Sequence, residues 1–80
     1  PKGAHKMVFE KLKKILSEQL EIKEDYINLD SNIVDDLGAS SLDIVDIVTC
    51  IESEFSLEVP DELIENVQTV GDIVDFIEEQ

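Results

Sequence analysis

The chain has 80 residues, enough for one compact domain and too few for two. Apolar residues make up 42% of it, but no apolar run approaches the roughly 20 residues that a membrane-spanning helix needs. The first residues lack a hydrophobic leader, so we expect neither a membrane protein nor a secretory precursor. The single cysteine, Cys50, excludes an internal disulfide framework and a multi-cysteine zinc site, and it fits a cytoplasmic setting.

Charge is distributed unevenly along the chain. Residues 1–23 carry all six lysines and three glutamates, a net charge of +3, and the remaining 17 acids bring the total to −14. Residues 24–80 contain no lysine or arginine. Such a surface repels nucleic acid and anionic lipid and attracts basic partner proteins, or it serves only to keep a small domain soluble.

The N-terminal region divides into two parts. Residues 1–6 resemble an expression remnant ahead of a natural start at Met7, so the domain is assigned to residues 7–80. His5 falls in that remnant, and no catalytic or metal-binding role is assigned to it. The recurrence of apolar residues every three to four positions then predicts an amphipathic helix from Val8 to Glu21.

Residues 22–39 break the helical pattern with turn-forming residues. Six apolar side chains in the segment are nevertheless available for burial: Ile22, Tyr26, Ile27, Leu29, Ile33 and Leu37. We therefore expect an ordered loop that these side chains hold against the core. Long ordered loops in compact domains often carry function.

A second helix is predicted to run to about Phe55. Its start is marked by a capping box, in which Ser40 is the N-cap and Asp43 occupies the third helical position. At 3.6 residues per turn its apolar residues fall on one face: Ile44, Ile47, Val48, Ile51 and Phe55. Cys50 falls beside the polar face and is assigned no role.

Two more helices complete the predicted fold. A short helix from about Asp61 to Asn66 follows Pro60, because proline and acidic residues are typical of a first helical turn. The last helix begins at Thr69 with a second capping box, and its apolar stripe comprises Val70, Ile73, Val74 and Ile77. Since no segment shows strand alternation, we expect an all-α bundle of three longer helices and one short helix.

Enzymatic constellations are missing from this pattern. Cys50 has no base nearby in sequence, so Ser-His and Cys-His catalysis is not supported, and no pair of carboxylates stands out from the others. A calcium loop starting at Asp30 fails, because Val34 and Asp35 occupy positions where a ligand and a glycine are needed. We expect no enzyme and no metal site.

The junction between loop and second helix remains. A phosphate on a serine in the first helical turn is favoured by unpaired N–H groups and by the helix dipole. The simpler interpretation is that Ser40 and Ser41 only cap the helix.

Residues 36–43 read Asp-Leu-Gly-Ala-Ser-Ser-Leu-Asp and resemble the Asp-Leu-Gly-Ala-Asp-Ser-Leu-Asp signature of acyl carrier proteins. The similarity continues through residues 52–55, 59–62 and 69–72 and covers essentially residues 7–80. It implies that Ser41 carries 4′-phosphopantetheine, transferred from coenzyme A by a phosphopantetheinyl transferase. The thiol of that arm would hold acyl groups as thioesters and present them to fatty-acid synthesis enzymes with basic surfaces.

The resemblance also assigns surface and core residues. Six positions match partner contacts: Ser40, Leu42, Asp43, Asp46, Thr49 and Glu52. Seven match core positions that line an acyl-chain cavity: Ile47, Val48, Ile51, Phe55, Leu63, Val70 and Val74. The family usually has aspartate at the position of Ser40 and often methionine at that of Thr49, so both positions depart from its pattern.

Three alternatives stay open at this point. The carrier could serve polyketide synthesis in trans, or carry peptidyl or aminoacyl groups. From a different class, it could be an acidic interaction module that is never modified. In each case we expect a monomer without nucleic-acid binding or membrane insertion.

Overall fold

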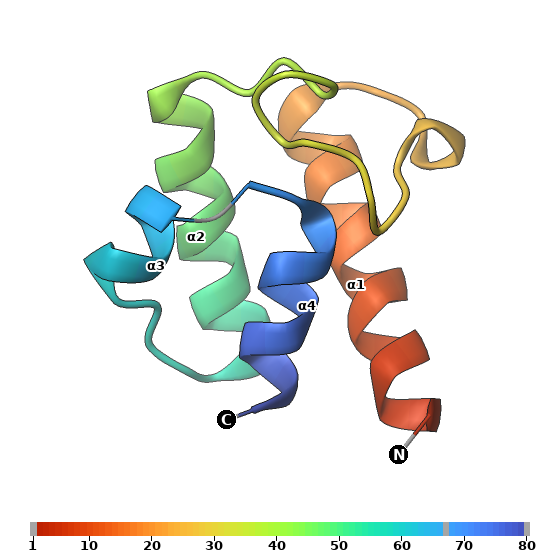
Figure 1. Cartoon of the computed structure of the whole chain (residues 1–80), viewed down its shortest axis with the longest axis vertical. Helices are drawn as coiled ribbons and strands as arrows, with labels where there is room; N and C mark the ends of the chain where they lie inside the picture. Colours follow the sequence, from red (N-terminus) through yellow and green to blue (C-terminus); the bar gives the residue numbers. More distant parts are fainter. Residues whose placement is uncertain (1, 67, 80) are drawn as a thin grey trace.

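The computed structural model describes residues 2–66 and 68–79. Four α-helices and one 3₁₀ turn follow in order: α1 Lys2–Leu20, η1 Glu24–Tyr26, α2 Ser41–Phe55, α3 Asp61–Asn66 and α4 Val70–Glu78. Figure 1 shows α2 and α4 running in the same direction and α1 running opposite to both. The predicted all-α bundle is confirmed, and the described residues form no strand beyond one isolated bridge between Asn32 and Thr69.

Helix α1 is longer at its start than the apolar pattern predicted. It begins at Lys2 instead of Val8. Alanine and lysine, which occur in this stretch, are good helix formers. It ends at Leu20, one residue early, since Glu21 adopts a left-handed backbone with φ 55°. Leu12 and Leu16 are fully buried and place α1 against both α2 and α4.

The predicted bounds of α2 and α3 are confirmed, and α4 begins at Val70 with Thr69 as its N-cap. Helix α2 ends where Ser56 turns left-handed with φ 53°, and its residues Ile47 and Ile51 are buried. All four residues of the predicted α4 stripe are buried as well. Among the residues whose burial is described, eleven apolar ones form the core: Leu12, Leu16, Ile27, Ile33, Ala39, Ile47, Ile51, Val70, Ile73, Val74 and Ile77.

The connection between α1 and α2 is ordered, as predicted, but the prediction that Tyr26 helps to hold it against the core is wrong. Ile27 and Ile33 are buried, whereas Tyr26 is 67% exposed. Both residues lie in or beside the turn η1, where consecutive side chains point in different directions. Ile27 therefore takes the inward position and Tyr26 points to solvent.

The same loop is bound to the start of α4 by backbone hydrogen bonds. The Ile33 N–H donates to the Gln68 carbonyl at 2.9 Å, and the Gly71 N–H donates to the Leu29 carbonyl at 2.8 Å. A β-carbon on Gly71 would lie 3.1 Å from that Leu29 oxygen, so the close approach favours glycine. Loop and α4 thus form one unit next to the start of α2.

Candidate functional site

Residues 32–39 fix the backbone that leads into α2. The Asn32 Oδ1 accepts hydrogen bonds from the N–H groups of Val34 and Asp35 at 3.0 and 2.8 Å, which closes a tight turn. Gly38 has φ +73°, a conformation that glycine adopts without strain. The buried Ala39 follows and donates its N–H to the Ile33 carbonyl at 3.0 Å.

Ser40 and Asp43 form the predicted capping box. The Ser40 Oγ accepts from the Asp43 N–H at 3.2 Å, and the Asp43 Oδ2 accepts from the Ser40 N–H at 3.0 Å. Ser40 is therefore the N-cap, with an extended backbone, and Ser41 is the first residue of the helix. The two adjacent serines thus hold different positions.

Ser41 is exposed at the positive end of α2. Among the described residues, no acceptor bonds the N–H groups of Ser41 and Leu42. These two donors can hydrogen-bond an anion attached to the Ser41 hydroxyl. The residues present therefore fit a phosphodiester on Ser41, whereas the Ser40 oxygen is already part of the cap.

The six residues predicted as partner contacts all lie on or beside α2, but they differ in accessibility. Ser40, Leu42, Asp46 and Thr49 are exposed, Leu42 to 78%. Asp43 is half-buried in the cap.

Glu52 is also half-buried, and its Oε2 accepts from the Val59 N–H at 3.0 Å. The carboxylates of Glu52 and Asp43 are therefore engaged within the domain. Asp46 has no hydrogen-bond or ion-pair partner among the described residues.

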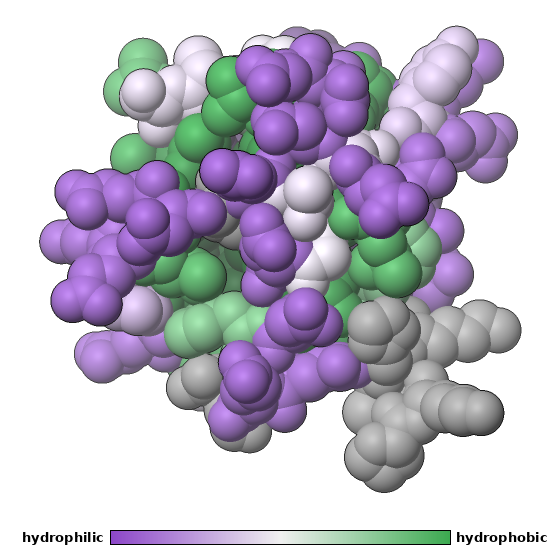
Figure 2. Space-filling view, in the orientation of Figure 1, coloured by the Kyte–Doolittle hydropathy of each residue, from purple (hydrophilic) through white to green (hydrophobic). Residues whose placement is uncertain are grey.

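The sequence prediction missed two apolar residues on this surface. Val45 is 56% exposed and lies one turn after Leu42, and Val34 is 50% exposed in the preceding loop. Hydrophilic residues cover most of the face in Figure 2, with hydrophobic residues showing between them. The exposure of Val45 was readable from its place off the apolar face of α2.

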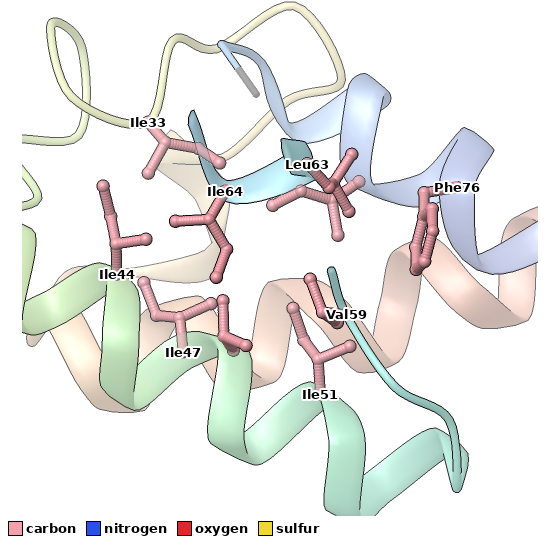
Figure 3. Close-up of a pocket in the computed structure, with 10 residues that line it drawn as sticks. Ile33, Ile44, Ile47, Ile51, Val59, Leu63, Ile64 and Phe76 are labelled. Carbon is pink, nitrogen blue, oxygen red and sulfur yellow. The ribbon is translucent and has the colours of Figure 1, made fainter. Parts of the chain in front are cut away.

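An apolar cavity of about 20 Å³ lies between α2, α3 and α4. Figure 3 shows side chains from α2 facing those from α3 and α4 across it. Four of the predicted cavity residues line it: Ile47, Val48, Ile51 and Leu63. Six lining residues were not predicted: Ile33, Ile44, Val59, Ile64, Ile73 and Phe76.

Three predicted cavity residues, all in the described part of the chain, do not line this cavity. Val70 and Val74 are fully buried in the core beside it, and Phe55 packs against that core near the end of α2. The Lys11 ammonium lies over the Phe55 ring, 5.8 Å from its centroid. Helical spacing identified these residues as apolar, but it does not tell which apolar neighbours enclose a space.

The cavity has room for about one water molecule, so an alkyl chain needs its walls to separate. Helix α3 is the wall that is held least. It has only six residues, and none of them is buried. Helix α4, in contrast, buries four side chains and packs on α1.

The lysines of α1 balance little of the acidic surface near α2. Lys11 lies 3.6 Å from Glu54 and Lys13 lies 3.4 Å from Glu10, both as exposed or half-exposed pairs. Such pairs contribute little free energy. The surface around Asp46 therefore keeps its negative charge.

Other kinds of site find no support in residues 2–66 and 68–79. No cluster of three metal-binding side chains occurs there, and no helix has the length and hydrophobicity to span a bilayer. The Cys50 thiol is half-buried and accepts a hydrogen bond from the Gln19 amide at 3.4 Å.

Comparison with known proteins agrees with the geometry. The family model described as a phosphopantetheine attachment site matches residues 10–77. An acyl carrier protein of Clostridium perfringens is 47% identical over 72 residues, which cover 90% of this chain and 95% of the relative. An acyl carrier protein of Clostridium acetobutylicum is 51% identical over 71 residues, 89% of this chain and 92% of the relative. The chain therefore belongs to the acyl carrier protein family, whose prosthetic group is 4′-phosphopantetheine.

Proposed function

We propose that Ser41 is the attachment residue and that the protein carries acyl groups for fatty-acid synthesis. The observation that carries the proposal is the exposed Ser41 hydroxyl beside two unpaired N–H donors at the start of α2. When bound, the phosphopantetheine arm supplies a thiol that holds an acyl group as a thioester. The chain itself binds the phosphate, orients the arm and offers an apolar cavity.

Intact mass after incubation with coenzyme A and a promiscuous transferase tests the attachment. We expect Ser41→Ala to gain no mass and Ser40→Ala to gain one phosphopantetheine. Since Ser40 still caps the helix in Ser41→Ala, the two variants separate loading from folding. Loading of Ser41→Ala, or failure of the wild type to load, would contradict the proposal. Failure of the wild type would instead favour an unmodified interaction module.

Partner binding is proposed to rest on Asp46 and the exposed Leu42. Asp46 offers a free charge to basic enzymes, and electrostatic steering gives fast, salt-sensitive association. Thr49, also exposed, is a secondary contact. Asp43 and Glu52 contribute mainly by holding the start of α2 and the loop after it, because their carboxylates already accept backbone hydrogen bonds.

Charge reversal separates these roles. Asp46→Lys should slow transfer to a partner enzyme, in a manner that weakens as salt rises, with melting unchanged. Asp75→Lys on α4 changes the net charge equally and is the matched control. Asp43→Lys should lower the melting temperature as well, since it removes the cap. If Asp46→Lys and Asp75→Lys slow transfer equally, only net charge matters.

The cargo is proposed to be fatty acyl, on the strength of similarity to the two clostridial acyl carrier proteins. The cavity supports this choice, because its lining is apolar throughout and offers nothing to pair with the amide groups of a peptidyl chain. A polyketide chain has polar carbonyls and would be disfavoured for the same reason. We further propose that the protein acts in the cytoplasm as a monomer and does no catalysis of its own.

A further inference from the structure

The residues that line the cavity are spread along α2, and those at its two ends differ. In Figure 3 the lining residues follow α2, with Ile33 and Ile44 at one end and Phe76 at the other. Ile44 lies one helical turn after Ser41, so an arm on Ser41 reaches this end first. At about 1.5 Å per residue, Ile44 and Ile51 are about 10 Å apart along the helix axis. An acyl chain entering near Ile44 therefore runs toward the Phe76 ring.

Phe76 belongs to the wall that is held most firmly. Its neighbours along α4, Ile73 and Ile77, are both buried, and the helix packs on α1. The ring faces the far end of the cavity, beyond Leu63 and Val59 (Figure 3). Helix α3 buries no residue and so is the wall that can move to widen the cavity, whereas Phe76 belongs to α4, which is held by four buried residues.

We propose that Phe76 is the end stop that sets the longest acyl segment the cavity can enclose. The inference rests on the proposed loading of Ser41. In this proposal the two helices control different properties of the cavity: the position of α3 sets how wide it can become, and α4 limits its length. Carbons beyond the limit stay in water, where they add no stability to the protein.

A series of acyl chains of increasing length, loaded on Ser41 from acyl-coenzyme A, tests this. In the wild type, the melting temperature should rise with each added methylene and then reach a plateau, because only enclosed methylenes leave water. In Phe76→Ala the plateau should move to chains longer by about two to four carbons, since the vacated space relaxes in part. In Phe76→Trp it should move to shorter chains.

Phe55→Ala is the matched control. Phe55 is also a half-buried phenylalanine packed against the core, but it does not line the cavity. It should lower all melting temperatures and leave the plateau length unchanged. Should Phe76→Ala be too unstable to measure, Phe76→Leu and Phe76→Trp still move the plateau in opposite directions.

The outcomes distinguish the two proposals. Intact mass reports loading. If no acylated protein forms, the result contradicts the assignment of Ser41 as the attachment residue and does not test the role of Phe76. With loading confirmed, a plateau that stays fixed in every Phe76 variant, or that moves equally in Phe55→Ala, overturns the end stop. A melting temperature that is independent of chain length in the wild type overturns it as well, because nothing is then enclosed.

Discussion

Helices α2 and α4 begin with the same capping motif, but the surroundings of their N-termini differ. Helix α4 starts with Thr69 and Asp72 in a capping box equivalent to that of Ser40 and Asp43. At α4, however, the first-turn N–H groups of Val70 and Gly71 donate to loop carbonyls at 3.0 and 2.8 Å. At α2 the corresponding N–H groups of Ser41 and Leu42 have no acceptor among the described residues.

This difference shows that a capping motif alone does not determine whether the N-terminus of a helix is available to bind an anionic group. The capping box satisfies the same N–H group in both helices, so helix formation is supported equally. What differs is the loop of residues 29–33, which covers one start and leaves the other open. Only the open start can accept an added anionic group.

The largest expected effect is the loss of loading when the open start loses its hydroxyl. Ser41→Ala should abolish the mass gain and change the free energy of unfolding by no more than about 0.5 kcal/mol, as an exposed substitution does. Ser40→Ala should do the reverse, with loading retained and about 1 kcal/mol of stability lost with the cap. Mass spectrometry and urea unfolding measure the two quantities.

The contact between the loop and the N-terminus of α4 is disrupted most directly by a substitution at Gly71. A methyl group there presses on the Leu29 carbonyl at 3.1 Å, and overpacking costs about 1–3 kcal/mol. Alanine regains about 0.5–1 kcal/mol of helix propensity, so Gly71→Ala should lose about 1 kcal/mol net. Urea unfolding checks this value. A gain in stability would mean that the loop adjusts without cost.

Acid titration sharpens the comparison at Asp72. Hydrogen bonds from the Thr69 and Gln68 N–H groups hold the pKa of the Asp72 carboxyl below its ordinary value of 3.8. A pKa that is lower in the folded state adds stability above the unfolded value, and this is lost as pH falls through the folded value.

Asp72→Asn should therefore be less stable than the wild type at pH 7, by a modest amount because the side chain is exposed. The difference should shrink as the pH falls below about 4. Thermal unfolding across that range measures it. A difference that persists unchanged in acid would mean that charge is not involved.

The smallest effect on stability is expected for Ser40→Asp. Both residues are good N-caps, and the added charge interacts favourably with the helix dipole, so stability should change by at most about 0.5 kcal/mol. The charge also lies beside Ser41, and it should speed loading by a basic transferase at low salt. Loading rates compared at two salt concentrations test this, and equal rates would show that position 40 acts only as a cap.

The sequence predicted most of the fold, because its signals are local. Capping boxes marked the starts of α2 and α4, apolar periodicity predicted the end of α2, and Pro60 with the acids after it marked α3. The extension of α1 to Lys2 was not predicted, since residues 2–6 carry no apolar periodicity. Tyr26 was misplaced because apolar character alone does not tell which side of a short turn a residue occupies.

Less of the candidate site was accessible from the sequence. The position of Ser41 in the first turn of α2 followed from the cap of Ser40, but the engagement of Glu52 by the Val59 N–H depends on how the next loop folds back. Ile33 and Phe76 come from the loop and from α4, far from α2 in sequence. That both line the same cavity as α2 is a tertiary property that no local pattern contains.

The hydrogen bonds between loop and α4 have a consequence for protein synthesis. Ile33 is held by the Gln68 carbonyl, and Ala39, next to the serines, is held by the Ile33 carbonyl. The turn before Ser41 is therefore completed by residues that leave the ribosome late. A nascent chain in which Ser41 has emerged from the ribosome but residues 68–71 have not lacks this support. We therefore expect a transferase to modify Ser41 only after residues 68–71 have emerged and bound the loop.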